Sequence, residues 1–278
     1  MTITPSSPTW RALEFYGTRV HHRGKWRIHN WLRSKLNVDR FTGDITVRRL
    51  GLDWCLNPSD FVQSYFYWLE EFETWDWFHL NKLVKPQSIV FDIGANFGFY
   101  SLLFAHKLNC QVHAFEPGAQ MFKRLQGNVS LNHLNHSVNA VPIGLSCVQE
   151  QAYLSTEPSN SGASFIGQSG QSVQLDTLDN YCSKNSINHV DFMKIDVEGY
   201  EMRVLRGGKN MIAAFKPLLL IEINYDALAR AGSLAVELES ALRDIGYSLF
   251  ISRRKKLLPF VGNLRPGQLI NVFAFHVN

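Results

Sequence analysis

Long apolar runs are missing from this 278-residue chain. No stretch approaches the roughly 18 uninterrupted apolar residues of a membrane-spanning helix, and the opening MTITPSSPTW lacks the charged start and apolar block of a secretory signal. With 45% hydrophobic and 19% charged residues, the chain has the composition of a globular protein. We therefore expect a cytoplasmic location.

Metal-binding patterns are also missing. The four cysteines form no CxxC pair, and the ten histidines show neither HxH nor HExxH spacing. The sequence therefore predicts no metal site and four free thiols, at Cys55, Cys110, Cys147 and Cys182.

Positive charge is concentrated in one segment, although the net charge of the chain is only +4. Residues 19–49 hold nine Lys and Arg against two Asp. Such a segment would suit an acidic substrate, an anionic membrane surface or nucleic acid, but a solvated basic face is the commoner outcome. Nucleic-acid binding is thus disfavoured, peripheral contact with an anionic surface stays open, and nothing assigns an oligomeric state.

Residues 1–84 differ from the rest of the chain and are interpreted as an aromatic and basic cap. A helix is predicted over residues 61–84, because aromatic and apolar residues recur there at three- and four-residue spacing. This stripe is expected to pack in the core. Two rings off the stripe, Tyr67 and Trp77, are expected to have an ordinary amphipathic surface role, and a platform for a sugar or ring substrate is the less favoured alternative. The stripe consists of Phe61, Tyr65, Trp68, Leu69, Phe72 and Trp75.

From residue 85 to 278, short β-branched or aromatic runs alternate with helical segments, which predicts an α/β domain with a mostly parallel sheet. The last of seven strands is expected to run antiparallel. The polar, Gly- and Ser-rich residues 155–172 are interpreted as a long loop, and residues 253–256 as an exposed connection. The predicted strands are 88–93, 111–115, 140–145, 190–195, 218–223, 247–251 and 270–275.

The first of these strands runs into a glycine turn and then into a helix, in the segment VFDIGANFGFYS. Gly94 permits the tight turn, Ala95, Asn96 and Gly98 let a ligand approach the backbone, and the N–H groups of the next helix attract an anion. In S-adenosylmethionine (SAM) that anion is the methionine carboxylate, with Asp92 near the amino group. A plain turn between strand and helix is the alternative.

An acidic residue ends the second strand. Glu116 is placed to accept the ribose hydroxyl protons of a nucleoside cofactor, and Pro117 closes the strand. The spacing Gly94-x-x-x-Gly98 lacks the second glycine of G-x-G-x-x-G, which argues against a dinucleotide-dependent oxidoreductase.

Together these blocks resemble the FkbM-type SAM-dependent methyltransferases. The resemblance covers roughly residues 70–278 and rests on FDIGANFGFYS, FEP, LDTLD, DFMKIDVEGYE and LLLIEI, in the family's order and spacing. It implies a class I methyltransferase Rossmann-like fold, cofactor contacts at Asp92, Gly94, Asn96 and Glu116, and an active-site acid at Asp196. Members of the family methylate mostly hydroxyl oxygens of sugars, glycolipids and polyketides, and some act on peptide amides.

The residues themselves agree, because Phe192, Lys194 and Asp196 alternate to one side of the fourth strand and Asp196 reaches its ligand-binding end. We interpret Asp196 as the group that accepts the acceptor's proton or orients the acceptor, with Lys194 or Glu222 tuning its charge. A structural ion pair is the alternative for Lys194 and Asp196. A carboxylate satisfied by its surroundings is the alternative for Glu222.

Three functions follow from this pattern. The favoured one is O-methylation of a sugar, glycolipid or polyketide-type small molecule. The others are methylation of a peptide amide or another macromolecule, and binding of SAM or a nucleotide without catalysis.

Overall fold

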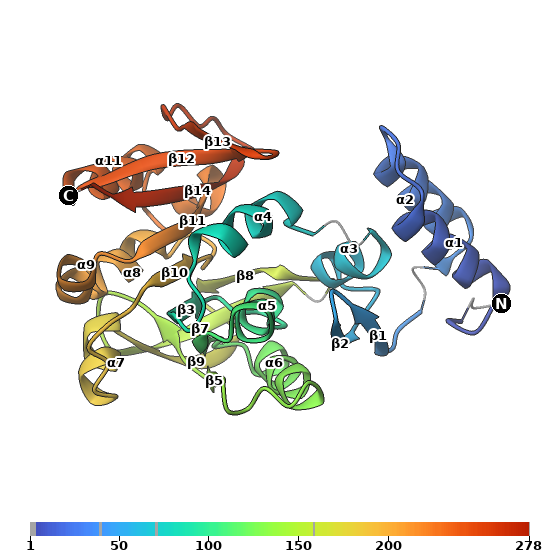
Figure 1. The fold of residues 1–278 in the computed structure, drawn as a ribbon, viewed down its shortest axis with the longest axis horizontal. Coiled ribbons are helices and arrows are strands. Elements are labelled where there is room, and N and C mark those ends of the chain that lie inside the picture. The colour runs from blue at the N-terminus through green and yellow to red at the C-terminus, as the bar shows by residue number, and fades with distance from the viewer. Residues whose placement is uncertain (1–3, 39–40, 70–71, 158, 278) are drawn as a thin grey trace. The chain divides into compact units, whose positions relative to one another are not determined.

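The computed structural model describes residues 4–38, 41–69, 72–157 and 159–277 (Figure 1). The chain divides into two compact units, one formed by residues 1–74 with 157–162 and the other by residues 75–156 with 163–278. The predicted boundary after residue 84 remains a prediction. Within the basic segment, Asp39 and Arg40 lie outside the described residues.

The first unit is built around Trp10. Helix α1 (Pro8–Arg19) begins where Ser7 caps the backbone N–H of Trp10, with a proline in the first turn. The indole Nε1–H of Trp10 donates to the hydroxyl of Tyr67 at 2.8 Å, and its ring lies 4.7 Å from that of Trp68. Tyr67 is only 2% exposed, so the surface role predicted for it is wrong, and so is the alternative of a substrate platform. The remaining elements are α2 (Lys25–Lys35), β1 (Ile45–Arg49), β2 (Leu52–Leu56) and α3 (Phe61–Leu69).

The single helix predicted over 61–84 is also wrong. Helix α3 ends at Leu69, and α4 (Thr74–Leu83) starts anew after Glu73, whose φ of 45° is left-handed. The predicted stripe therefore loses its phase: Trp68 is buried, whereas Phe61 and Trp75 are 56% and 40% exposed. Residues 70 and 71 of the predicted helix lie outside the described part of the chain.

The second unit contains an eight-stranded sheet in the order β13-β12-β14-β11-β10-β3-β4-β5. Five consecutive strands of this order are parallel: β11, β10, β3, β4 and β5. Strand β14 runs antiparallel to both β11 and β12, as predicted for the last strand. The bounds are β3 (Ile89–Ile93), β4 (Gln111–Phe115), β5 (Val138–Val141), β10 (Phe192–Ile195), β11 (Leu218–Asn224), β12 (Tyr247–Arg253), β13 (Lys256–Pro259) and β14 (Leu269–His276).

Two details of this sheet differ from the prediction. Residues 253–256 are exposed and connect two strands, as predicted, but they do so in a tight hairpin in which Arg253 pairs with Lys256, and this hairpin adds β13 as an eighth strand. The strand expected over 140–145 divides into β5 and β6 (Gly144–Leu145), and β6 belongs to a second sheet.

The second sheet replaces the long loop predicted over residues 155–172. Its order is β6-β9-β7-β8, with β7 (Glu150–Glu157), β8 (Asn160–Gly167) and β9 (Gln171–Asp176). Leu154, Val173 and Leu175 form a small buried core of this sheet, and every residue of β8 is only partly buried. Polar composition was therefore no evidence against strands here. Residue 158, within the predicted loop, lies outside the residues that the structure describes.

Helices cover the large sheet on both faces (Figure 1). Alternate strand residues such as Phe91, Met193 and Ile221 join one apolar core with α7 (Leu178–Lys184), α8 (Glu201–Gly207), α9 (Lys209–Phe215), α10 (Tyr225–Arg230) and α11 (Ala235–Asp244). On the other face, α5 (Phe99–Leu108) places Phe104 against Phe192 of β10 and Trp77 of α4. Helix α6 (Ala119–Leu131) follows β4. In the part of the chain that the structure describes, no helix is both long and apolar enough to span a bilayer.

Candidate functional site

The predicted glycine turn joins β3 to α5. Gly94 and Gly98 have left-handed φ values of 84° and 95°, and Asn96 between them has a φ of 50°. The N–H groups of Gly94 and Ala95 both donate to the carbonyl of Phe115, at 3.0 and 2.9 Å, which fastens the turn to the end of β4. A Cβ atom at Gly94 would lie 1.8 Å from the carbonyl oxygen of Asp196. Glycine is therefore required at this position by both conformation and space.

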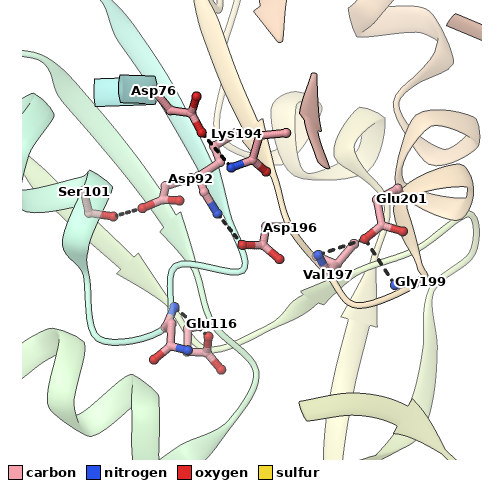
Figure 2. Close-up of polar contacts among 11 residues, drawn as sticks. Asp76, Asp92, Ser101, Glu116, Lys194, Asp196, Val197, Gly199 and Glu201 are labelled. Atoms are coloured by element: carbon pink, nitrogen blue, oxygen red, sulfur yellow. Dashed lines mark hydrogen bonds and ion pairs between the residues drawn. The ribbon is translucent and has the colours of Figure 1, made fainter. Parts of the chain in front are cut away.

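Glu116 is held beside this turn by its backbone. Its Oε2 accepts the N–H of Asn96 at 2.9 Å, and its Oε1 accepts the N–H of Gly118 at 2.8 Å. Figure 2 shows where Glu116 lies relative to Asp92 and Asp196. Burial raises the pKa of Glu116 to about 7, although both backbone hydrogen bonds oppose this rise. Pro117 follows at the end of the strand, where the chain turns toward α6.

A row of buried polar side chains crosses the face of the sheet that α4 and α5 cover. Asp92 of β3 and Lys194 of β10 are neighbours in register, and both are almost completely buried. Asp92 accepts the hydroxyl of Ser101 at 2.5 Å, and the Lys194 ammonium lies 2.7 Å from Oδ2 of Asp196 (Figure 2). Burial raises the pKa of Asp92, while Lys194 opposes that rise. The predicted alternation of Phe192, Lys194 and Asp196 is thus present.

Three carboxylates converge where β10 and β11 end. One oxygen each of Asp196, Glu198 and Glu222 lies within 4.8 Å of the other two. Glu198 reaches this position through a left-handed φ of 50° directly after β10. Burial, and then the neighbouring Asp196, raise the pKa of Glu198 to about 8. The same two causes, burial first, raise the pKa of Glu222 well above its ordinary value.

Two acids at this site were missed by sequence reasoning. Glu201, at the start of α8, is fully buried, and its Oε1 accepts the N–H groups of Val197 and Gly199 at 3.1 Å each (Figure 2). Its signal was available, because an acid in the first turn of a helix often caps the preceding loop. Asp76 of α4 accepts the side-chain amide of Asn271 on β14 at 2.8 Å. Burial raises its pKa.

The structure thus brings the predicted residues together at one edge of the sheet. The glycine turn and Glu116 form one side, and Lys194, Asp196 and Glu222 form the other. They meet where Gly94 packs against the backbone carbonyl of Asp196. This is the edge at which open α/β sheets bind ligands.

The sequence is similar to those of known proteins. Residues 92–249, more than half of the chain, match the model of a family described as the methyltransferase FkbM domain. The hexuronic acid methyltransferase AglP of Haloferax volcanii is 26% identical over 145 residues, which cover 50% of this chain and 57% of AglP. The AMB antimetabolite synthetase AmbE of Pseudomonas aeruginosa is 24% identical over 211 residues, which cover 61% of this chain and 10% of AmbE. The chain therefore spans only part of either relative.

A solved structure is also similar. The methyltransferase FkbM from Methylobacillus flagellatus KT aligns with 97% of this chain and 58% of its own, at 14% identity and a TM-score of 0.46.

Proposed function

Because this chain belongs to the methyltransferase FkbM family, we propose that it transfers a methyl group from SAM to a hydroxyl oxygen of a sugar or another small polyhydroxylated molecule. The observation that carries the proposal is the convergence of Asp196, Glu198 and Glu222 beside the glycine turn. A hydroxyl acceptor has to lose a proton during transfer, and acidic side chains at the ligand edge are suited to take it. The name of the relative AglP, a hexuronic acid methyltransferase, favours a sugar acid among the candidate acceptors.

The cofactor side of the site has the donors and acceptors that SAM requires. Glu116 offers a buried carboxylate at the end of β4, which suits the two hydroxyls of a ribose. The turn from Gly94 to Gly98 precedes α5, whose first N–H groups suit a carboxylate. Asp92 is 1% exposed and already bonded to Ser101, so we assign it to holding the turn and Lys194 rather than to direct contact.

On the acceptor side, we assign to Asp196 the role of accepting the proton that the acceptor hydroxyl loses. Its side chain is 27% exposed, whereas that of Lys194 is 6% exposed, so the carboxylate faces the ligand edge and the ammonium supports it from within. The bound sulfonium supplies an already activated methyl group, so the protein's work is to align the acceptor oxygen, remove its proton and exclude water. The Lys194 ammonium, at 2.7 Å, holds the Asp196 carboxylate in a fixed orientation at this edge.

The test is methyl transfer from radiolabelled SAM to a panel of uronic acids, neutral sugars, polyketide alcohols and peptides. We expect incorporation into a hydroxylated small molecule, and a loss of about 100-fold or more in turnover for Asp196→Asn. Calorimetric titration with SAM should give nearly unchanged affinity for this variant. Asp244→Asn, at an exposed position on α11, is the matched control. Full turnover by Asp196→Asn would remove Asp196 from this role, and incorporation into peptides alone would overturn the acceptor class.

A further inference from the structure

We propose that Asp196, Glu198 and Glu222 form a binding site for one divalent cation, Mg²⁺ or Mn²⁺. Binding itself does not depend on the proposed function; only its use, to hold an acceptor oxygen at this edge, rests on it. Asp196 and Glu198 follow β10, and Glu222 lies in the neighbouring parallel strand β11. The site contains no His or Cys, so the spacing of those residues gives no sign of it.

The geometry is that of oxygen ligands around a small cation. One oxygen of each carboxylate lies within 4.8 Å of the other two. Around Mg²⁺, at about 2.1 Å from each ligand, adjacent oxygens lie about 3 Å apart and opposite ones about 4 Å apart. The donor set is entirely carboxylate, which suits Mg²⁺ and Mn²⁺ rather than the nitrogen- and sulfur-seeking Zn²⁺.

A second observation points to a ligand at this place. Oε1 of Glu222 is buried without a hydrogen-bond partner among the described residues. Glu222 itself is only 9% exposed. Leaving a buried carboxylate oxygen without a donor is costly, so native structures normally satisfy it. The carboxylate is directed toward Asp196 and Glu198, where a bound cation would satisfy it.

The local charge balance also favours a cation. Lys194 is engaged with Asp196 at 2.7 Å, so one ammonium faces three converging carboxylates. Arg230 donates to the backbone carbonyl of Glu198 at 3.2 Å, and its guanidinium lies 4.0 Å from the ring centroid of Phe165. It therefore braces the Glu198 loop through its backbone. A divalent ion bound here would replace the protons that these closely spaced acids otherwise share, and its charge would stabilise all three as carboxylates.

The experiment is a titration of the full chain, freed of metal with EDTA and exchanged into clean buffer, with Mn²⁺ followed by electron paramagnetic resonance. Binding removes the signal of free Mn²⁺, and added Mg²⁺ should restore it by competition. We expect one Mn²⁺ per chain and at least about tenfold weaker binding in Glu222→Gln and in Glu198→Gln. Glu239→Gln is the matched control, because Glu239 is a buried acid of α11 outside the site, and it should bind as the wild type does.

Thermal unfolding and SAM titration of the same samples establish that the variants are folded. If Glu222→Gln does not fold, the partly exposed Glu198 carries the test. No Mn²⁺ uptake by the wild type, or undiminished uptake by a folded site variant, overturns the proposal and means that the three acids share protons instead. SAM binding without Mn²⁺ binding would reject the cation site alone, and Mn²⁺ binding without SAM binding would reject the proposed function alone.

Discussion

Glu116 should make the stability of the protein depend on pH in a way that one substitution removes. Burial raises its pKa from the ordinary 4.5 to about 7 in the folded chain. The folded state therefore holds this proton more tightly than the unfolded state does. Its contribution to stability is fully present below pH 4.5 and is lost as the pH rises through 7.

The size of the effect follows from the two pKa values. The difference between 4.5 and about 7 corresponds to about 3 kcal/mol in the free energy of unfolding, or up to about 1.4 kcal/mol per pH unit within that interval. Glu116→Gln cannot titrate, so its free energy of unfolding should fall less steeply with pH than that of the wild type. The amide also loses an acceptor for the N–H of Asn96 or Gly118, which shifts the whole curve but not its slope.

Urea unfolding at several pH values between 5 and 8 measures both slopes. Glu150→Gln, whose side chain is 39% exposed, is the control and should follow the wild type. The ribose hydroxyls of SAM favour the ionised carboxylate, so SAM binding by the wild type should strengthen about tenfold per pH unit as the pH rises toward 7. Parallel unfolding curves for the wild type and Glu116→Gln would refute the reasoning, since they would mean that Glu116 titrates alike in both states.

Two further substitutions test the fold around the site and the first unit. Gly94→Ala puts a Cβ atom 1.8 Å from a backbone oxygen at a φ of 84°, so it should lower the free energy of unfolding, measured in urea, by about 3 kcal/mol or more. The control Gly127→Ala, in open space on a helix, should raise that free energy by up to about 1 kcal/mol. Tyr67→Phe leaves the buried indole N–H of Trp10 unpaired and should lower the free energy of unfolding by about 1–3 kcal/mol; the exposed Tyr153→Phe should leave it unchanged, and equal effects would contradict the buried hydrogen bond.

The parallel core of the sheet was predictable because its strands are buried on both faces. Segments such as IVFDI and LLLIEI are apolar runs interrupted by a single acid each, and their observed bounds agree with the predicted ones within two residues. Strands β7, β8 and β9 were missed because they have few buried apolar residues: Leu154, Val173 and Leu175 form a small core, with the partly buried Ala152, Ile166 and Tyr200 packed against it. The break after α3 was missed because the apolar spacing continues through it.

The site could be predicted only where residues lie at strand ends or alternate along a strand. Position in the motif places Asp196 and Glu222 at the ends of adjacent parallel strands, and parallel pairing then brings them together. Asp76 carries no such signal, because it meets Asn271 across 195 residues through the packing of α4 on β14. Oε1 of Glu222 lacks a hydrogen-bond partner among the described residues because no donor packs within reach of it. Spacing along the sequence does not predict which donors pack near a given oxygen, so this feature could not be predicted.

The segment 157–162 has a consequence for the order in which the chain folds. It belongs to the first unit, although residues 75–156 before it belong to the second. The carboxylate of Asp60, at the start of α3, accepts the N–H of Ser161 at 2.6 Å and its hydroxyl at 3.0 Å, and the N–H of Phe61 donates to Ser159 at 2.8 Å. During synthesis, domains usually fold from the N-terminus onward. Here the unit that begins first has to wait for residue 162 before its packing is complete, by which time the glycine turn and Glu116 have already been made.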